Sequence, residues 1–150
     1  MIIIKKWIVC FFFMITLIFF TQSYAETTIK LAIIDNFHYQ KFVTTRYKEY
    51  YLLGLELALV EAKKSGINIK YRIFQYDDDP LSILGKIPEL VEWEPDLILG
   101  PRDSNRFLLL APYIKNTLTL SPFATSTDIK KMPNNFYAIT LLSNYEAVAI

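Results

Sequence analysis

The sequence predicts an α/β fold in which a doubly wound parallel sheet carries helices on both faces. Short apolar segments typical of buried strands alternate along the chain with segments of helical periodicity. This alternation is how parallel strands are joined, because each crossover needs a helix or a comparable length of chain. Polar and small residues follow several of the strands directly, where an open parallel sheet has its ligand crevice. The 150 residues, 53% of them hydrophobic, are enough for one domain of ordinary size.

The first half of the chain is expected to form strand, helix and strand. Ile29–Ile34 is a continuous apolar run of strand length. After an aromatic-rich loop, Tyr47–Lys64 places apolar residues at helical spacing, and Ser65-Gly66 provides a stop signal. Apolar and polar residues then alternate over Ile67–Ile73, which predicts a strand with one wetter face.

The second helical segment contains two residues that weaken helices. Ser82–Trp93 has helical periodicity, but Gly85 and Pro88 interrupt it. Leu97–Leu99 follows as a short buried strand and stops at a glycine-proline pair. We therefore expect an interrupted crossover between the second and third strands.

The remaining chain continues the alternation. A helix is predicted from Ser104 toward Lys115, bent or ended early by Pro112. Strands are predicted at Leu118–Leu120 and Phe136–Ile139, and a further helix at 143–150.

The N-terminal 25 residues have the three parts of a signal peptide. Lys5 and Lys6 form a basic start, Ile8–Phe20 is an apolar stretch, and Ser23-Tyr24-Ala25 is a small-x-small cleavage site. The alternative is an uncleaved membrane anchor, but this stretch of 13 residues, broken only by Thr16, is short for a span of roughly 20. We expect cleavage after Ala25, export, and no stable membrane anchor afterwards.

Composition excludes several classes of function for the mature chain, 26–150. The single cysteine, Cys10, lies in the segment expected to be removed, so disulfides and thiolate chemistry are excluded. Without Lys5 and Lys6 the chain has 14 basic and 15 acidic residues, net −1, which is not the basic field of a nucleic-acid-binding protein.

The sequence also lacks the motifs of enzymes and cofactor-binding proteins. Only four glycines are present, and no phosphate loop, dinucleotide fingerprint or nucleophile elbow occurs. His38 has neither a second histidine nor a cysteine to complete a metal site. Asp77–Asp79 precedes a proline, and we interpret this acidic run as a turn rather than a cation site. We expect no catalysis, no cofactor and no metal.

Four polar corners are predicted to meet at one edge of the sheet. They are Asp35-Asn36, Asp77–Asp79, Gly100–Ser104 and Ser121–Thr127, each at the carboxyl end of a predicted strand. In open parallel sheets ligands bind beyond these ends, so the sequence predicts a site there.

The order of four motifs resembles one family. "GLELA" in the long helix, "YDDDP", "LILGPRDS" and "LSPFATS" together resemble the N-terminal lobe of type I periplasmic solute-binding proteins, the leucine/isoleucine/valine receptor group of ABC importers. The resemblance covers about residues 28–150. It implies a periplasmic receptor for an amino acid or similar small polar solute that delivers it to an ABC permease. It also implies that 26–150 is the N-terminal lobe and that the second lobe is absent from this chain.

The resemblance implies a set of ligand-binding residues. Ser104 falls on the serine that touches the ligand, Phe123 on the residue that binds through its backbone, Thr125 on the hydroxyl ligand, and Tyr47 on the aromatic residue above the ligand. A structural role is open for three of them: Ser104 as a helix cap, Thr125 as a turn former, and Tyr47 as a core aromatic.

The sequence departs from the family around two of the corners. Arg102, Asp103 and Arg106 replace small residues, and Phe123 is large where a small residue is usual. Arg102 and Arg106 could together bind a carboxylate or phosphate, or they could belong to a solvated helix start. These changes suit a larger, more acidic or more aromatic solute than leucine. They also leave open a secreted regulatory or scaffolding protein that binds a protein partner.

Overall fold

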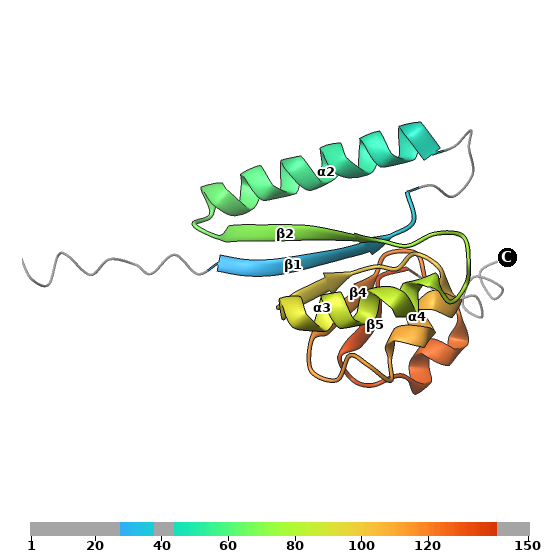
Figure 1. Ribbon diagram of the computed structural model, residues 1–150. Coiled ribbons are helices and arrows are strands. Elements are labelled where there is room, and N and C mark those ends of the chain that lie inside the picture. The colour runs from blue at the N-terminus through green and yellow to red at the C-terminus, as the bar shows by residue number, and fades with distance from the viewer. Residues whose placement is uncertain (1–27, 38–43, 141–150) are drawn as a thin grey trace, which may run out of the picture.

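A computed structural model describes residues 28–37 and 44–140 of the chain. The predicted signal peptide and the predicted helix at 143–150 lie outside these residues. Within them the elements follow the predicted order (Figure 1). In chain order they are β1 (Thr28–Asp35), α2 (Thr44–Lys64), β2 (Asn68–Gln75), the 3-10 helix η1 (Ser82–Lys86), α3 (Ile87–Trp93), β3 (Leu97–Leu99), α4 (Ser104–Leu110), β4 (Leu118–Ser121), the 3-10 helix η2 (Thr127–Lys131) and β5 (Phe136–Ala138).

The five strands form one parallel sheet in the order β2-β1-β3-β4-β5. The longest pairing joins β1 and β2 from Thr28↔Asn68 to Asp35↔Gln75. The order reverses at β1, because the chain first adds β2 on one side and then β3 to β5 on the other. The carboxyl ends of β1 and β3 therefore flank a topological switch point, which is where ligands bind in open α/β sheets.

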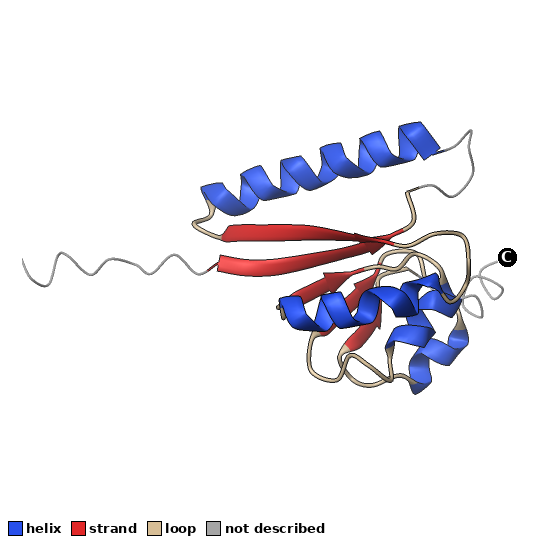
Figure 2. Ribbon diagram, viewed as in Figure 1, coloured by secondary structure: helices blue, strands red, loops and turns tan. Residues whose placement is uncertain are grey.

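Helices cover both faces of the sheet, as the sequence predicted (Figure 2). Along β1, Leu31 and Ile33 face α2 and pack near Leu55. The alternate residues Ala32 and Ile34 belong to the larger core on the other face. That core also contains buried apolar residues of η1, α3 and α4: Ile83, Ile87, Leu90, Phe107 and Leu110. The fold is doubly wound for this reason.

The interrupted second helical segment, Ser82–Trp93, forms two short helices. η1 ends at Lys86, and α3 begins at Ile87 with Pro88 in its first turn. A proline is tolerated there because the first helical N–H groups have no partner within the helix. Pro88 therefore begins a helix and does not disturb its interior. α4 ends at Leu110, before Pro112, as predicted.

The cap of α4 lies one residue earlier than the sequence suggested. Asp103 is the N-cap residue, and its Oδ1 accepts a hydrogen bond from the backbone N of Arg106 at 2.9 Å. The interpretation of Ser104 as the cap is therefore wrong. The Ser104 hydroxyl has different partners, described below.

In the described parts of the chain, no helix has both the length and the apolar character that crossing a bilayer requires.

Candidate functional site

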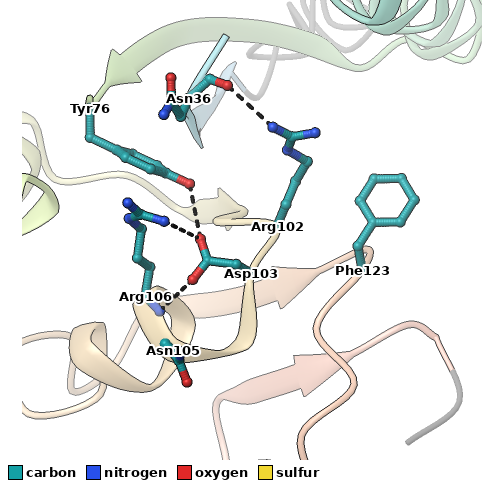
Figure 3. A pocket seen from close by; sticks show the side chains of 7 residues that line it. All are labelled: Asn36, Tyr76, Arg102, Asp103, Asn105, Arg106 and Phe123. Carbon is teal, nitrogen blue, oxygen red and sulfur yellow. Dashed lines mark hydrogen bonds and ion pairs between the residues drawn. The ribbon is translucent and has the colours of Figure 1, made fainter. Parts of the chain in front are cut away.

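A cavity of about 610 Å³ opens at the carboxyl edge of the sheet (Figure 3). Successive strand ends supply its walls: Asn36 follows β1, Tyr76 follows β2, Arg102 follows β3, and Phe123 follows β4. The start of α4 completes the lining with Asp103, Asn105 and Arg106.

An ion pair joins the ends of β1 and β3 beside this cavity. The Nε of Arg102 donates to Oδ1 of Asp35 at 2.9 Å, and its Nη2 donates to the carbonyl oxygen of Asn36 at 3.2 Å. The same Asp35 oxygen accepts the backbone N–H of Asn36 at 2.7 Å. Only 3% of the Asp35 side chain is exposed, so this carboxylate depends on these donors. Arg102 is fixed in place and is not a solvated side chain.

A second charged cluster forms the opposite wall. Oδ2 of Asp103 accepts from Nη1 of Arg106 at 3.1 Å and from the hydroxyl of Tyr76 at 3.4 Å. The guanidinium of Arg106 lies 5.0 Å from the centre of the Tyr76 ring, which adds a cation–π contact. Its Nη2 donates to the carbonyl oxygen of Asp78 at 2.8 Å, while its buried Nε has no hydrogen-bond partner.

The cavity wall is close to electrically neutral, because each arginine has its own carboxylate. Arg102 is matched by Asp35 and Arg106 by Asp103. The two arginines line one cavity, but they do not form the unpaired cationic pair that the sequence allowed. A ligand here would meet hydrogen-bond donors held in fixed directions. It would not meet a strongly positive electrostatic potential.

Two tyrosines near the cavity remain protonated at neutral pH. Burial, with a smaller contribution from Asp35, raises the pKa of Tyr51 to about 12, although Arg102 opposes this. Burial, followed by the carboxylates of Asp103 and Asp35, also raises the pKa of Tyr76 well above its usual value. Both phenols therefore keep their proton and can donate a hydrogen bond. Tyr51 projects from α2 and makes an edge contact with Phe37, with ring centres 5.6 Å apart.

The corner 121–127 is held to the start of α4 by the Ser104 hydroxyl. Oγ of Ser104 accepts the backbone N–H groups of Thr125 at 3.0 Å and Ser126 at 3.1 Å. Within the corner, Oγ of Ser121 donates to the carbonyl oxygen of Pro101 at 2.6 Å and accepts from the N–H of Ala124 at 3.1 Å. Oγ of Ser126 caps η2. The serine hydroxyls of the corner therefore form hydrogen bonds with backbone groups that have no partner within the sheet or a helix.

The structure brings four of the five predicted site residues into one region. Arg102 and Phe123 line the cavity, and the Phe123 side chain is 55% exposed. Ser104 and Thr125 are joined by the hydrogen bond just described and adjoin the lining residues Asp103 and Asn105 along the chain. Tyr47 falls in α2, but its side chain lies outside the described part of the structure.

The acidic run forms a turn, as interpreted from the sequence. Oδ1 of Asp77 accepts the N–H of Asp79 at 3.0 Å, and Oδ1 of Asp79 accepts that of Leu81 at 2.9 Å. Oδ1 of Asp78 accepts from the Asn36 side chain at 2.7 Å. Among residues 28–37 and 44–140, no group of histidine, cysteine or acidic side chains is arranged to hold a metal.

Sequence reasoning did not identify Tyr76 and Asn105 as cavity residues. β2 runs to Gln75, two residues beyond the predicted strand end, and Tyr76 is the first residue after it. A strand drawn two residues longer would have marked Tyr76 as a strand-end residue. Asn105 lies in the first turn of α4, and its sequence context carries no signal for the site.

Several solved structures of substrate-binding proteins share this fold. LivJ of Streptococcus pneumoniae, a branched-chain amino-acid substrate-binding protein in complex with isoleucine, matches with a TM-score of 0.63 and 17% identity over 77% of this chain and 34% of its own. An ABC transporter substrate-binding protein of Desulfitobacterium hafniense in complex with leucine matches with a TM-score of 0.66 and 16% identity, over 81% and 36%. A solute-binding protein of Rhodopseudomonas palustris in complex with 3,4-dihydroxybenzoic acid gives 0.58 and 16%, over 77% and 32%.

These likenesses show that the chain has a periplasmic-binding-protein-like α/β fold, as the resemblance predicted. The chain spans about a third of the length of these proteins. No known family profile matches the sequence. No curated protein sequence matches it either.

Proposed function

We propose that this chain forms one wall of the solute-binding cleft of an exported substrate-binding component of an ABC importer. Residues 26–150 would be the N-terminal lobe, which works in the periplasm after removal of residues 1–25. The solute would be an amino acid or a similar small polar molecule, passed on to an ABC permease.

One observation is the main support for this proposal. Each of the four strands β1 to β4 is followed by a residue that lines the same cavity, at the switch point of the sheet. A solute bound there would contact residues from distant parts of the chain at once. The shared fold of proteins whose structures contain isoleucine, leucine or dihydroxybenzoic acid supports a small-molecule ligand.

The lining favours a solute with a carboxylate and an apolar body. Arg102, which stays partly exposed beside its partner Asp35, and Asn105 line the cavity with side chains that can donate to a carboxylate. Phe123 lines the cavity with an aromatic ring, and more than half of this residue is exposed. Covering this ring with an apolar group would remove it from water, so we place aromatic carboxylates beside amino acids as candidates.

Calorimetric titration of the complete gene product tests the proposal. The panel should contain branched-chain and aromatic amino acids, benzoic acids and short dicarboxylates. Binding of at least one of them is expected, and Phe123→Ala should weaken it about tenfold through lost apolar contact. Tyr113→Ala is the matched control, because Tyr113 is 51% exposed and does not line this cavity. A panel without any binding, or equal weakening by both variants, would overturn the proposal and favour the protein-binding alternative.

A further inference from the structure

Helix α2 is apolar on two opposite faces. Its inner face packs on the sheet through Tyr51, Leu52, Leu55 and Leu59. A helix at the surface of a domain ordinarily has one such stripe and a polar outer face. The outer face of α2 instead carries four large apolar side chains in solvent: Tyr50 at 69% exposure, Leu53 at 52%, Leu57 at 60% and Val60 at 51%.

The four exposed residues have the spacing of a helix-packing seam. Positions 50, 53, 57 and 60 are separated by three, four and three residues, the a/d pattern of a heptad repeat. They form a stripe about 15 Å long on one side of the helix. We call Tyr50, Leu53, Leu57 and Val60 the outer seam.

A glycine beside the outer seam gives a second indication. Gly54 lies in the interior of α2, where glycine costs roughly 1 kcal/mol relative to alanine. A Cβ at this position would meet nothing within 4 Å, so nothing within the described chain requires a glycine here. A missing side chain next to an apolar seam does allow another backbone to approach closely.

We propose that the outer seam of α2 is the interface between two copies of this chain, with their α2 helices packed antiparallel about a two-fold axis. With the axis level with Leu55, Leu53 of one copy meets Leu57 of the other, and Tyr50 meets Val60. Tyrosine then faces the smaller valine and leucine faces leucine, whereas a parallel pair would stack tyrosine on tyrosine. Two-fold dimers are the commonest symmetric assemblies, and such an interface must be self-complementary.

Flanking charges favour the antiparallel arrangement. It places Glu49 of each copy beside Lys63 of the other, giving two opposite-charge pairs. A parallel pair would instead bring Glu56 of each copy against Glu61 of the other, giving two like-charge pairs. The antiparallel pair has one acidic contact, between the two copies of Glu56 at the axis. At the helix ends, Arg46 approaches Lys64, whose charge is already paired with Glu61 at 2.7 Å.

Sedimentation equilibrium of the complete gene product, over protein concentrations from about 1 to 100 µM, tests the proposal. A monomer–dimer equilibrium is expected. Leu53→Glu with Leu57→Glu should raise the dimer dissociation constant at least tenfold, while the circular dichroism spectrum stays that of the folded chain because both side chains are exposed. Leu81→Glu is the matched control: Leu81 is 58% exposed but lies away from α2, and the dimer should persist.

A charge exchange tests the orientation. Glu49→Lys alone should weaken the dimer, and adding Lys63→Glu in the same chain should restore it, because both pairs are then reversed. A protein that stays monomeric to 100 µM would overturn the proposal, as would a dimer that survives the two glutamates or that the second exchange fails to restore. Binding of the monomer to phospholipid vesicles through the outer seam would also overturn it, in favour of a membrane surface. None of these results depends on whether the cavity binds a solute.

Discussion

The guanidinium of Arg102 and the carboxylate of Asp35 lie 2.9 Å apart across the ends of two neighbouring strands, at the point where the order of the sheet reverses. Asp35 is the last residue of β1, and its side chain is almost fully buried. Arg102 reaches it from the loop after β3 and keeps 27% of its side chain exposed at the cavity. One residue thus stabilises the sheet edge and forms part of the candidate site.

Removing the arginine should cost stability. Arg102→Gln leaves a buried carboxylate without its cation, and breaking such pairs costs about 3 kcal/mol. The Asp35→Asn, Arg102→Gln double variant should recover part of this loss, because no buried charge is left unpaired. Urea unfolding of both single variants and of the double variant gives the coupling energy.

Lys131→Ala provides the control for this cycle. Lys131 pairs with Asp128 at 2.7 Å, but 81% of its side chain is exposed, so its removal should leave the urea midpoint unchanged. If the effects of Asp35→Asn and Arg102→Gln simply add, the two residues do not act as a pair.

A substitution at Gly100 should disturb the same edge through the backbone. Gly100 has φ of +97°, a conformation that residues with side chains rarely adopt. A Cβ there would also overlap the carbonyl oxygen of Ile34 in β1. We expect Gly100→Ala to lower the free energy of unfolding by at least about 3 kcal/mol, because strain and overlap add.

Gly85→Ala is the matched comparison in η1, where a Cβ would meet nothing within 4 Å. It should be neutral or slightly stabilising in the same urea measurement. Equal losses for the two variants would contradict the steric explanation.

The fold could be predicted because hydrophobic periodicity and turn residues reflect local physics. Ala32 and Ile34 face one core while Leu31 and Ile33 face the other, so a strand buried on both faces reads as a continuous apolar run. Pro112 and Gly66 marked helix ends for equally local reasons. These signals need no knowledge of distant contacts.

The site was predicted less completely because its side chains are positioned by distant partners. Arg102 pairs with a residue 67 positions earlier in the chain, and Ser104 accepts from N–H groups 21 and 22 positions later. Neither partner can be read from the local sequence. The cap of α4 shows the same limit: Asp103 and Ser104 are both good cap residues, and the contact with the 121–127 corner occupies the serine.

Two tyrosines predict a loss of stability in alkaline solution. The folded chain holds the phenol protons of Tyr51 and Tyr76 more tightly than the unfolded chain, since both pKa values are raised. Their contribution is therefore complete below about pH 10 and decreases as the pH rises; for Tyr51 it is lost between about pH 10 and 12. Urea midpoints measured from pH 8 to 12 should fall less steeply for Tyr51→Phe than for the wild type. Identical slopes would show that Tyr51 does not hold its proton in this way.

Substitutions at Ser104 and Thr125 should have different effects: the Ser104 hydroxyl has a structural role, and the Thr125 side chain has the proposed ligand-binding role. Ser104→Ala removes the acceptor for two backbone N–H groups, so it should lower the free energy of unfolding by about 1–3 kcal/mol. Thr125 takes part in that contact through its backbone, which Thr125→Ala keeps. Thr125→Ala should therefore keep this contact with Ser104, yet weaken the bound solute by about 1–2 kcal/mol if the Thr125 hydroxyl is a ligand.

Urea unfolding and calorimetric titration of the same two variants make the comparison. An unchanged affinity in Thr125→Ala, with a solute that Phe123→Ala does weaken, would return Thr125 to the role of a turn former. A stable Ser104→Ala protein would show that the 121–127 corner holds its shape without this hydroxyl. In that case the four strand ends, and not the contact between α4 and the corner, would fix the geometry of the cavity.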